Sequence, residues 1–213
     1  MATVKSFTFN PFQENTYIVF DETKECIILD PGCYRPTEKE ALANFISEND
    51  LKPVKLVLTH CHVDHVLGNK FIFDKYGLKP IIHKFEIPVL QKAIEWGGMY
   101  GIHGEQGPEP DSYIDENSLI TFGNTTLKSL FTPGHSPGSL SFYSENDKFV
   151  IAGDVLFYRS IGRTDLPGGD HDILLDSIKK TMFGALTDDF TVYSGHGPIT
   201  NIGEEKKNNP FLR

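Results

Sequence analysis

The sequence predicts a mixed α/β protein of the α+β type, in which helices cover two β-sheets. Short apolar runs with strand character occur in both halves of the 213-residue chain. These runs come in meander-like groups, and amphipathic helical segments separate the groups instead of alternating with single strands. Because the chain has no composition break and no low-complexity segment, residues 1–213 are expected to form one domain.

The first half contains apolar runs that end at turn residues and helices with one apolar face. The predicted strands are Phe7–Phe9, Thr16–Phe20, Cys26–Asp30, Val54–Leu58 and Ile81–Ile82, and the predicted helices are Thr37–Asn49, Val66–Tyr76 and Ile87–Trp96. In the first helix, Leu42, Phe45 and Ile46 share a face. Thr37 and Glu40 have the spacing of a capping box, which predicts a helix start at Thr37.

The second half repeats this style. Its predicted strands are Ser118–Phe122, Thr125–Phe131, Ser139–Tyr143, Phe149–Ala152 and Val192–Tyr193, and its predicted helix is Ile173–Phe183. The Gly- and Pro-rich stretch Gly97–Asn117 is the most loop-like part of the chain and a candidate lid. Within and beside it, Trp96, Met99 and Tyr100 are expected to form an apolar wall or a dimer contact.

Charge and cysteine usage exclude several classes of protein. The chain has 20 Lys and Arg against 29 Asp and Glu, a formal net charge of −9, which disfavours a nucleic-acid partner. No apolar run approaches the ~18 residues of a membrane span, and the N-terminus lacks a signal-peptide core, so we expect a cytoplasmic protein without a membrane partner. Three unpatterned cysteines predict neither a disulfide framework nor a thiolate zinc cluster.

The phrase LVLTHCHVDHVLGN, residues 56–69, concentrates metal-ligand side chains directly after a predicted strand. Imidazole and carboxylate ligands suit Zn²⁺, and also iron or manganese. Residues two apart on an extended loop point to the same side, so His60 and His62 can bind one ion. Asp64 and His65, where the next helix begins, can then reach a second ion.

Three further ligand-type residues occupy the same structural position as this motif. His135, Asp154 and His196 each come directly after a glycine that follows a predicted strand. The glycine permits a tight turn, which delivers the side chain at the rim of a sheet. Five histidines and two aspartates at the ends of successive strands therefore predict a metal site.

The His-x-His-x-Asp-His motif, together with these three residues, resembles the ligand pattern of the metallo-β-lactamase superfamily over nearly the whole chain. The resemblance implies an αββα sandwich with a two-metal site at one edge of the sheets. It assigns His60, His62 and His135 to the first ion, Asp64, His65 and His196 to the second, and Asp154 to both.

Longer phrases resemble the short, single-domain type II glyoxalases, which hydrolyse S-lactoylglutathione and similar thioesters. These phrases are FNPFQENTYIV, GDVLFYRSIGRTDLPGGD and the tail IGEEKKNNPFLR. The resemblance implies two divalent ions, zinc first, and a metal-bound hydroxide that Asp64 orients toward the thioester carbonyl. Such a mechanism needs no serine nucleophile, and the chain has no GxSxG elbow.

The same resemblance points to the substrate contacts. Arg163 matches the Lys or Arg that contacts the acidic glutathione part of the substrate, and Lys206 is a second expected contact. Two departures separate this chain from the larger glyoxalases. Asp165 stands where they have an aromatic residue, and only residues 197–213 follow the last ligand, so no separate C-terminal helical domain is expected to bind glutathione.

The same residues are compatible with other functions. A mononuclear iron persulfide dioxygenase has the same fold and a GRTD phrase like residues 162–165, with its iron held at positions matching His60, His135 and Asp154. A lactonase or another ester hydrolase uses the same kind of metal site. A metal-binding protein without catalysis would show a damaged ligand set, and none of the ligands is missing. The sequence leaves both a monomer and a homodimer open.

Overall fold

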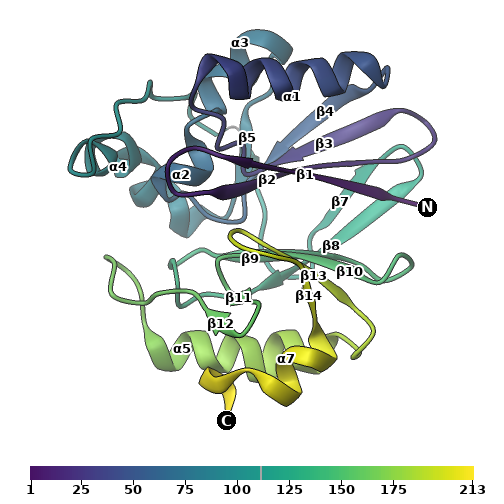
Figure 1. Ribbon diagram of the computed structural model, residues 1–213, viewed down its shortest axis with the longest axis vertical. Coiled ribbons are helices and arrows are strands. Elements are labelled where there is room, and N and C mark those ends of the chain that lie inside the picture. Colours follow the sequence, from purple (N-terminus) through teal and green to yellow (C-terminus); the bar gives the residue numbers. More distant parts are fainter. Residues whose placement is uncertain (111) are drawn as a thin grey trace.

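Two six-stranded sheets pack face to face, and helices cover the outer face of each sheet (Figure 1). This computed structural model describes residues 1–110 and 112–213. The four layers confirm the predicted αββα architecture. In the described part of the chain, no helix combines the length and apolar character that a membrane span requires.

The first sheet has the strand order β1-β2-β3-β4-β5-β6. Its strands are β1 (Thr3–Phe9), β2 (Glu14–Phe20), β3 (Glu25–Leu29), β4 (Lys52–Val57), β5 (Pro80–Ile82) and β6 (Ser112–Tyr113). The first three strands pair antiparallel through short turns, whereas β3 to β6 pair parallel because longer connections cross over between them. These connections contain the helices α1 (Pro36–Glu48), α2 (Val63–Val66), α3 (Asn69–Tyr76) and α4 (Ile87–Gly98), with the 3₁₀ turn η1 (Lys84–Glu86) before α4.

The second sheet has the order β14-β13-β10-β9-β8-β7. Its strands are β7 (Leu119–Phe122), β8 (Thr125–Phe131), β9 (Leu140–Ser144), β10 (Phe149–Gly153), β13 (Thr191–Ser194) and β14 (Thr200–Asn201), and β11 (Leu156–Phe157) and β12 (Ser160–Ile161) form a separate hairpin. Its helical segments are α5 (His171–Asp176), the π-helical η2 (Ser177–Met182), α6 (Phe183–Ala185), α7 (Ile202–Asn208) and the 3₁₀ turn η3 (Pro210–Leu212).

A buried apolar cluster between the sheets holds them together; we call it the inter-sheet core. Ile27 and Leu29 of β3 belong to it from the first sheet, and Phe142 and Ile151 from the second. Burying one such side chain stabilises the fold by about 1.5–3 kcal/mol. Two further clusters lie under the outer helices, one on each side. The inter-sheet core fixes how the edges of the two sheets lie relative to each other.

The predicted strands lie close to their expected positions, but the short strands β6, β11, β12 and β14 were not predicted, and several helix boundaries differ. The predicted capping box at Thr37 is wrong, because α1 begins at Pro36. The Glu38 side chain reaches back and accepts hydrogen bonds from the backbone N–H groups of Tyr34 (2.8 Å) and Arg35 (3.0 Å). The helix predicted over Ile173–Phe183 is interrupted by the π-helical segment η2.

The candidate lid is partly ordered secondary structure. The helix α4 extends to Gly98, and the edge strand β6 pairs with β5 through Ser112 and Tyr113. Asp111, within the predicted lid, lies outside the described residues. The tail helix α7 is not among the predicted elements; Asn201 caps it by accepting a hydrogen bond from the backbone N–H of Glu204 (2.8 Å).

Candidate metal centre

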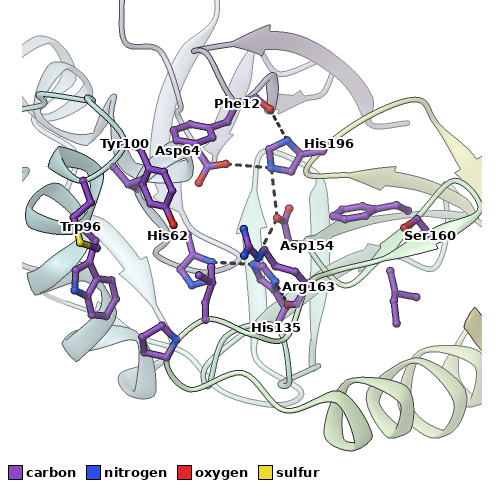
Figure 2. Close-up of a pocket in the computed structure, with 16 residues that line it drawn as sticks. Phe12, His62, Asp64, Trp96, Tyr100, His135, Asp154, Ser160, Arg163 and His196 are labelled. Carbon is purple, nitrogen blue, oxygen red and sulfur yellow. Dashed lines mark hydrogen bonds and ion pairs between the residues drawn. The ribbon is translucent and has the colours of Figure 1, made fainter.

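All seven predicted ligand residues gather at one edge of the sandwich, after strands of both sheets. Figure 2 shows five of them: His62, Asp64, His135, Asp154 and His196. They are His60 and His62 after β4, Asp64 and His65 in α2, His135 after β8, Asp154 after β10 and His196 after β13. Gly153 adopts a left-handed φ of 51° at the end of β10, so the predicted glycine turn is present before Asp154. The strand ends thus bring together side chains that are up to 136 positions apart, between 60 and 196.

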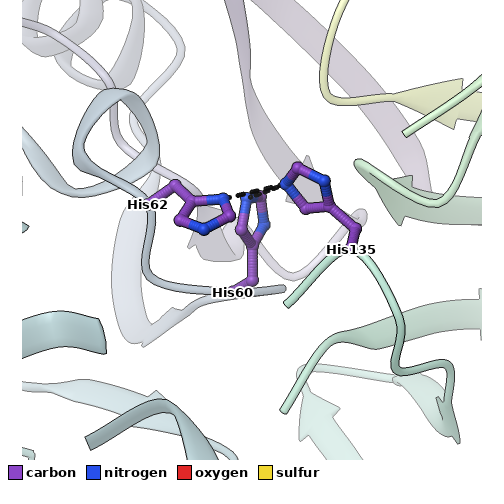
Figure 3. A group of neighbouring side chains, drawn as sticks. All are labelled: His60, His62 and His135. Carbon is purple, nitrogen blue, oxygen red and sulfur yellow. Dashed lines mark hydrogen bonds between the residues drawn. The ribbon is translucent and has the colours of Figure 1, made fainter. Parts of the chain in front are cut away.

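The first group consists of three imidazoles whose nitrogens converge (Figure 3). The Nε2 atom of His135 lies 2.8 Å from Nδ1 of His62 and 3.2 Å from Nε2 of His60. Burial lowers the pKa of all three rings, and that of His62 falls to about 3. The rings are therefore neutral at pH 7, which is the form of imidazole that binds metal ions.

The second group consists of Asp64, His65 and His196. The Oδ2 atom of Asp64 lies 3.1 Å from Nε2 of His196 and 3.7 Å from Nε2 of His65. Burial opposes a charge on His196, but hydrogen bonds with Asp154 and Asp64 outweigh it and raise the pKa of His196 to about 10. An ion that binds here must displace that proton.

Asp154 lies between the two groups. One of its carboxylate oxygens, Oδ2, is 3.5 Å from Nε2 of His135 and 3.4 Å from Nε2 of His196. The other, Oδ1, is 3.4 Å from Nε2 of His65. The carboxylate thus faces ligands of both groups, as a residue shared between two ions would.

Two buried polar atoms in this cluster test whether a metal fits. His65 Nε2 and Asp154 Oδ1 are buried without a hydrogen-bond partner among the described residues, although they lie 3.4 Å apart. Leaving such an atom unpaired costs about 1–3 kcal/mol. A divalent cation between them would satisfy both, and a mixed set of imidazole and carboxylate donors suits zinc, iron or manganese. The residues therefore fit divalent metal ions.

Hydrogen bonds to the ring nitrogens that point away from the centre fix the orientation of two of the candidate ligand rings. The Nδ1 atoms of His135 and His196 donate to the backbone carbonyls of Arg163 (2.7 Å) and Phe12 (3.1 Å). With a proton held on Nδ1, the neutral His135 ring presents an unprotonated Nε2 toward the centre, and His196 does the same once a metal ion has displaced its Nε2 proton. Backbone carbonyls therefore set the tautomers of two ligands.

Asp30 supports the second ligand group and was not among the residues predicted from the sequence. Its carboxylate lies 3.1 Å from Nδ1 of His65 and accepts hydrogen bonds from the N–H (2.7 Å) and the hydroxyl (2.6 Å) of Thr59. Asp30 directly follows β3 with a left-handed φ of 47°, so it ends a strand just as the ligands do. That position was the available signal, although Asp30 stands behind a ligand.

Comparison with known proteins agrees with this geometry. A family model described as the metallo-beta-lactamase superfamily matches residues 9–196, which is most of the chain and includes every predicted ligand. The chain belongs to the metallo-β-lactamase superfamily. The resemblance of its histidine motif to that superfamily is thereby confirmed.

Three similar proteins have informative names. The hydroxyacylglutathione hydrolase GloC of Haemophilus influenzae is 34% identical over 94% of this chain and 93% of its own length. A solved structure named BLEG-1 B3 metallo-beta-lactamase matches with a TM-score of 0.90 and 36% identity over 99% of both chains. A structure of TTHA1623 in a di-iron-bound form matches with a TM-score of 0.88 and 34% identity over 98% of this chain and all of that one.

A cavity of about 430 Å³ leads from the surface of this metallo-β-lactamase superfamily protein to the ligand cluster (Figure 2). Its walls include Trp96, Met99 and Tyr100, for which the sequence predicts an apolar wall or a dimer contact. Phe12 and Tyr100 make an edge-to-face contact with ring centroids 5.9 Å apart. Phe157 lines the cavity as well, so its lining combines aromatic side chains with metal-ligand residues.

The two expected substrate contacts have different surroundings. Arg163 lines the cavity, and its guanidinium donates to both carboxylate oxygens of Asp165 at 2.7 and 2.6 Å. Lys206 does not line the cavity; its ammonium pairs with Asp188 at 2.8 Å and lies over the ring of Phe183. The structure thus places the Lys206 ammonium beside Asp188 and Phe183 and not in the cavity wall.

Proposed function

We propose that this protein is a metal-dependent thioester hydrolase of the glyoxalase II type, which acts on S-lactoylglutathione or a similar small thioester. The observation that carries this proposal is an apolar cavity that ends at Asp64, Asp154 and three histidines. The name of the Haemophilus relative, a hydroxyacylglutathione hydrolase, supports the same chemistry.

Two divalent ions, with zinc as the first candidate, complete the proposed centre. His60, His62 and His135 would hold one ion and Asp64, His65 and His196 the other, with Asp154 shared. When bound, such ions supply Lewis acidity that lowers the pKa of water and polarises a carbonyl group.

The chain's own residues supply the positioning. Asp64 lines the cavity and its side chain is 13% exposed, so its carboxylate is accessible to accept a hydrogen bond from an attacking water. The aromatic walls bury the acyl group and the adjacent sulfur, which excludes bulk water from the reacting carbonyl. The backbone bonds to His135 and His196 keep these rings in place during the reaction.

One assay on purified, zinc-loaded protein tests the proposal. We expect two metal ions per chain by elemental analysis and hydrolysis of S-lactoylglutathione, followed as loss of thioester absorbance. Absence of turnover on every thioester tried, with both ions bound, would contradict the thioester hydrolase and leave lactones and β-lactams as the substrates to compare.

The second candidate function is that of a mononuclear iron persulfide dioxygenase. His60, His135 and Asp154 form a two-histidine, one-carboxylate set, which is typical of non-haem iron oxygenases. In the structure, Nε2 of His135 lies 3.2 Å from His60 and 3.5 Å from Asp154. One iron per chain, with O₂ consumption on glutathione persulfide and no thioester hydrolysis, would identify this chemistry.

The Arg163–Asp165 pair yields a prediction about substrate charge. Asp165 occupies the guanidinium that would otherwise bind an acidic substrate, so Asp165→Asn is expected to lower KM for S-lactoylglutathione about two- to fivefold. That range corresponds to an exposed ion pair of up to about 1 kcal/mol. The control is an uncharged thioester, S-lactoyl-N-acetylcysteamine, whose KM should not change. An equal change for both substrates would mean that Arg163 does not contact the acidic group.

A further inference from the structure

Glu86 is a fully buried carboxylate next to the candidate metal centre, although it is not one of its predicted ligands. It ends the 3₁₀ turn η1 and precedes α4. Its Oε2 accepts a hydrogen bond from the backbone N–H of Cys61 at 2.8 Å. Its Oε1 accepts from the hydroxyl of Ser136 at 2.6 Å and from the N–H of Gly138 at 2.7 Å.

These donors lie on two loops that carry metal-ligand residues. Cys61 stands between His60 and His62, on the loop that follows the first sheet's β4. Ser136 directly follows His135, on the loop that follows the second sheet's β8. A single side chain therefore joins the two segments that supply the three converging imidazoles.

The sequence is adapted to this contact. A Cβ atom at Gly138 would lie 2.8 Å from Cγ and 3.0 Å from Oε1 of Glu86, so glycine allows the close approach. Burying a carboxylate is unfavourable unless hydrogen bonds compensate it. Both oxygens of Glu86 are satisfied by donors, so the side chain has no free oxygen directed at a metal ion.

We infer that Glu86 is a positioning residue that sets the separation of His60 and His62 from His135 and thereby the affinity of the first metal site. The inference rests on the proposed metal centre. It requires only metal binding, so a protein that binds two ions without hydrolysing thioesters would contradict the proposed function and leave this inference standing.

The test variant is Glu86→Gln, which keeps the shape of the side chain but replaces one accepting oxygen by an NH2 group. This group only donates, so it cannot accept the hydrogen bond from Cys61 or from Ser136. Zinc affinity is measured by competition with a chromophoric chelator. We expect one of the two ions to bind about 10–100-fold more weakly, the usual effect of removing a group that orients metal ligands. The other ion should retain its affinity.

Glu205→Gln is the matched control. Glu205 is equally buried and also accepts three hydrogen bonds, from the N–H of Arg159 (2.9 Å), the hydroxyl of Thr200 (2.6 Å) and the amide of Asn209 (2.8 Å). None of these partners is a metal ligand, so this variant should lose stability but not zinc affinity.

Three results would overturn the inference. The first is an unchanged zinc affinity in Glu86→Gln, and the second is an equal loss of affinity at both metal sites. The third is the same loss of zinc affinity in Glu205→Gln. If Glu86→Gln does not fold, Ser136→Ala replaces it, because this change removes one of the three donors and leaves the carboxylate in place. Ser136→Ala should then lower the zinc affinity of one of the two sites and leave that of the other unchanged. Unchanged affinity at both sites would overturn the inference equally.

Discussion

Replacing Asp64 by asparagine is expected to lower kcat/KM for S-lactoylglutathione by about 10²–10⁴-fold, the contribution of a positioned acid–base group. The amide keeps the size of the side chain but removes its negative charge. That charge faces His196 at 3.1 Å and His65 at 3.7 Å, within the second ligand group. The variant should therefore lose the hydrogen-bond acceptor for the attacking water and also bind the second ion more weakly.

Measuring the metal content of the same preparations separates these two losses. If the Asp64→Asn protein retains two ions and is inactive, the Asp64 carboxylate acts mainly on the attacking water. If the variant retains only one ion, the main role of the carboxylate is to bind metal. The control is Asp176→Asn, since Asp176 is an exposed carboxylate paired with Lys180 on the helix layer. A wild-type rate in Asp64→Asn would contradict the proposed mechanism.

A methyl group at position 195 is expected to lower turnover by at least about 100-fold. The Cβ of a Gly195→Ala variant would overlap Oδ1 of Asp154 and lie 2.8 Å from Cε1 of His65. The loop has little freedom to withdraw, because the Gly195 N–H donates to Gly153 (2.8 Å) and its carbonyl accepts from Asn15 (2.7 Å). The shared carboxylate must move instead, and displacing a reacting group by about 1 Å can cost 10²-fold in rate.

Gly184→Ala is the matched control for this change. A Cβ at Gly184 meets no atom within 4 Å, and the residue lies in the short helix α6. That variant should retain full activity and gain up to about 1 kcal/mol in stability, because alanine restricts the unfolded chain. Full metal content and activity in Gly195→Ala would show that Asp154 is not held where the structure places it.

The ligand cluster was predictable because its signals are local. At His135, Asp154 and His196, an apolar run is followed within one to three residues by a glycine and then directly by the polar residue, and the end of the strand fixes where that side chain emerges. The strand boundaries were accessible for the same reason. Neither inference depends on knowing which distant segments meet.

The supporting residues depend on that knowledge. Glu86 meets donors that are 25 to 52 positions away, at Cys61, Ser136 and Gly138, and only the tertiary packing brings them together. The surroundings of Lys206 depend on the fold in the same way, because the fold decides which carboxylate lies beside this lysine. Here that carboxylate is Asp188.

The inter-sheet core influences the metal centre although its side chains do not belong to the candidate ligand groups. Four of the predicted ligands follow β4 of the first sheet and three follow strands of the second, so the distance between the two sets changes whenever the sheets shift against each other. Thermodynamic linkage makes this coupling reciprocal: packing that favours the metal-binding spacing raises affinity, and bound metal stabilises that packing equally. Substitutions at Phe142 or Ile27, deep between the sheets, are therefore a route by which metal affinity can be tuned without altering a single ligand.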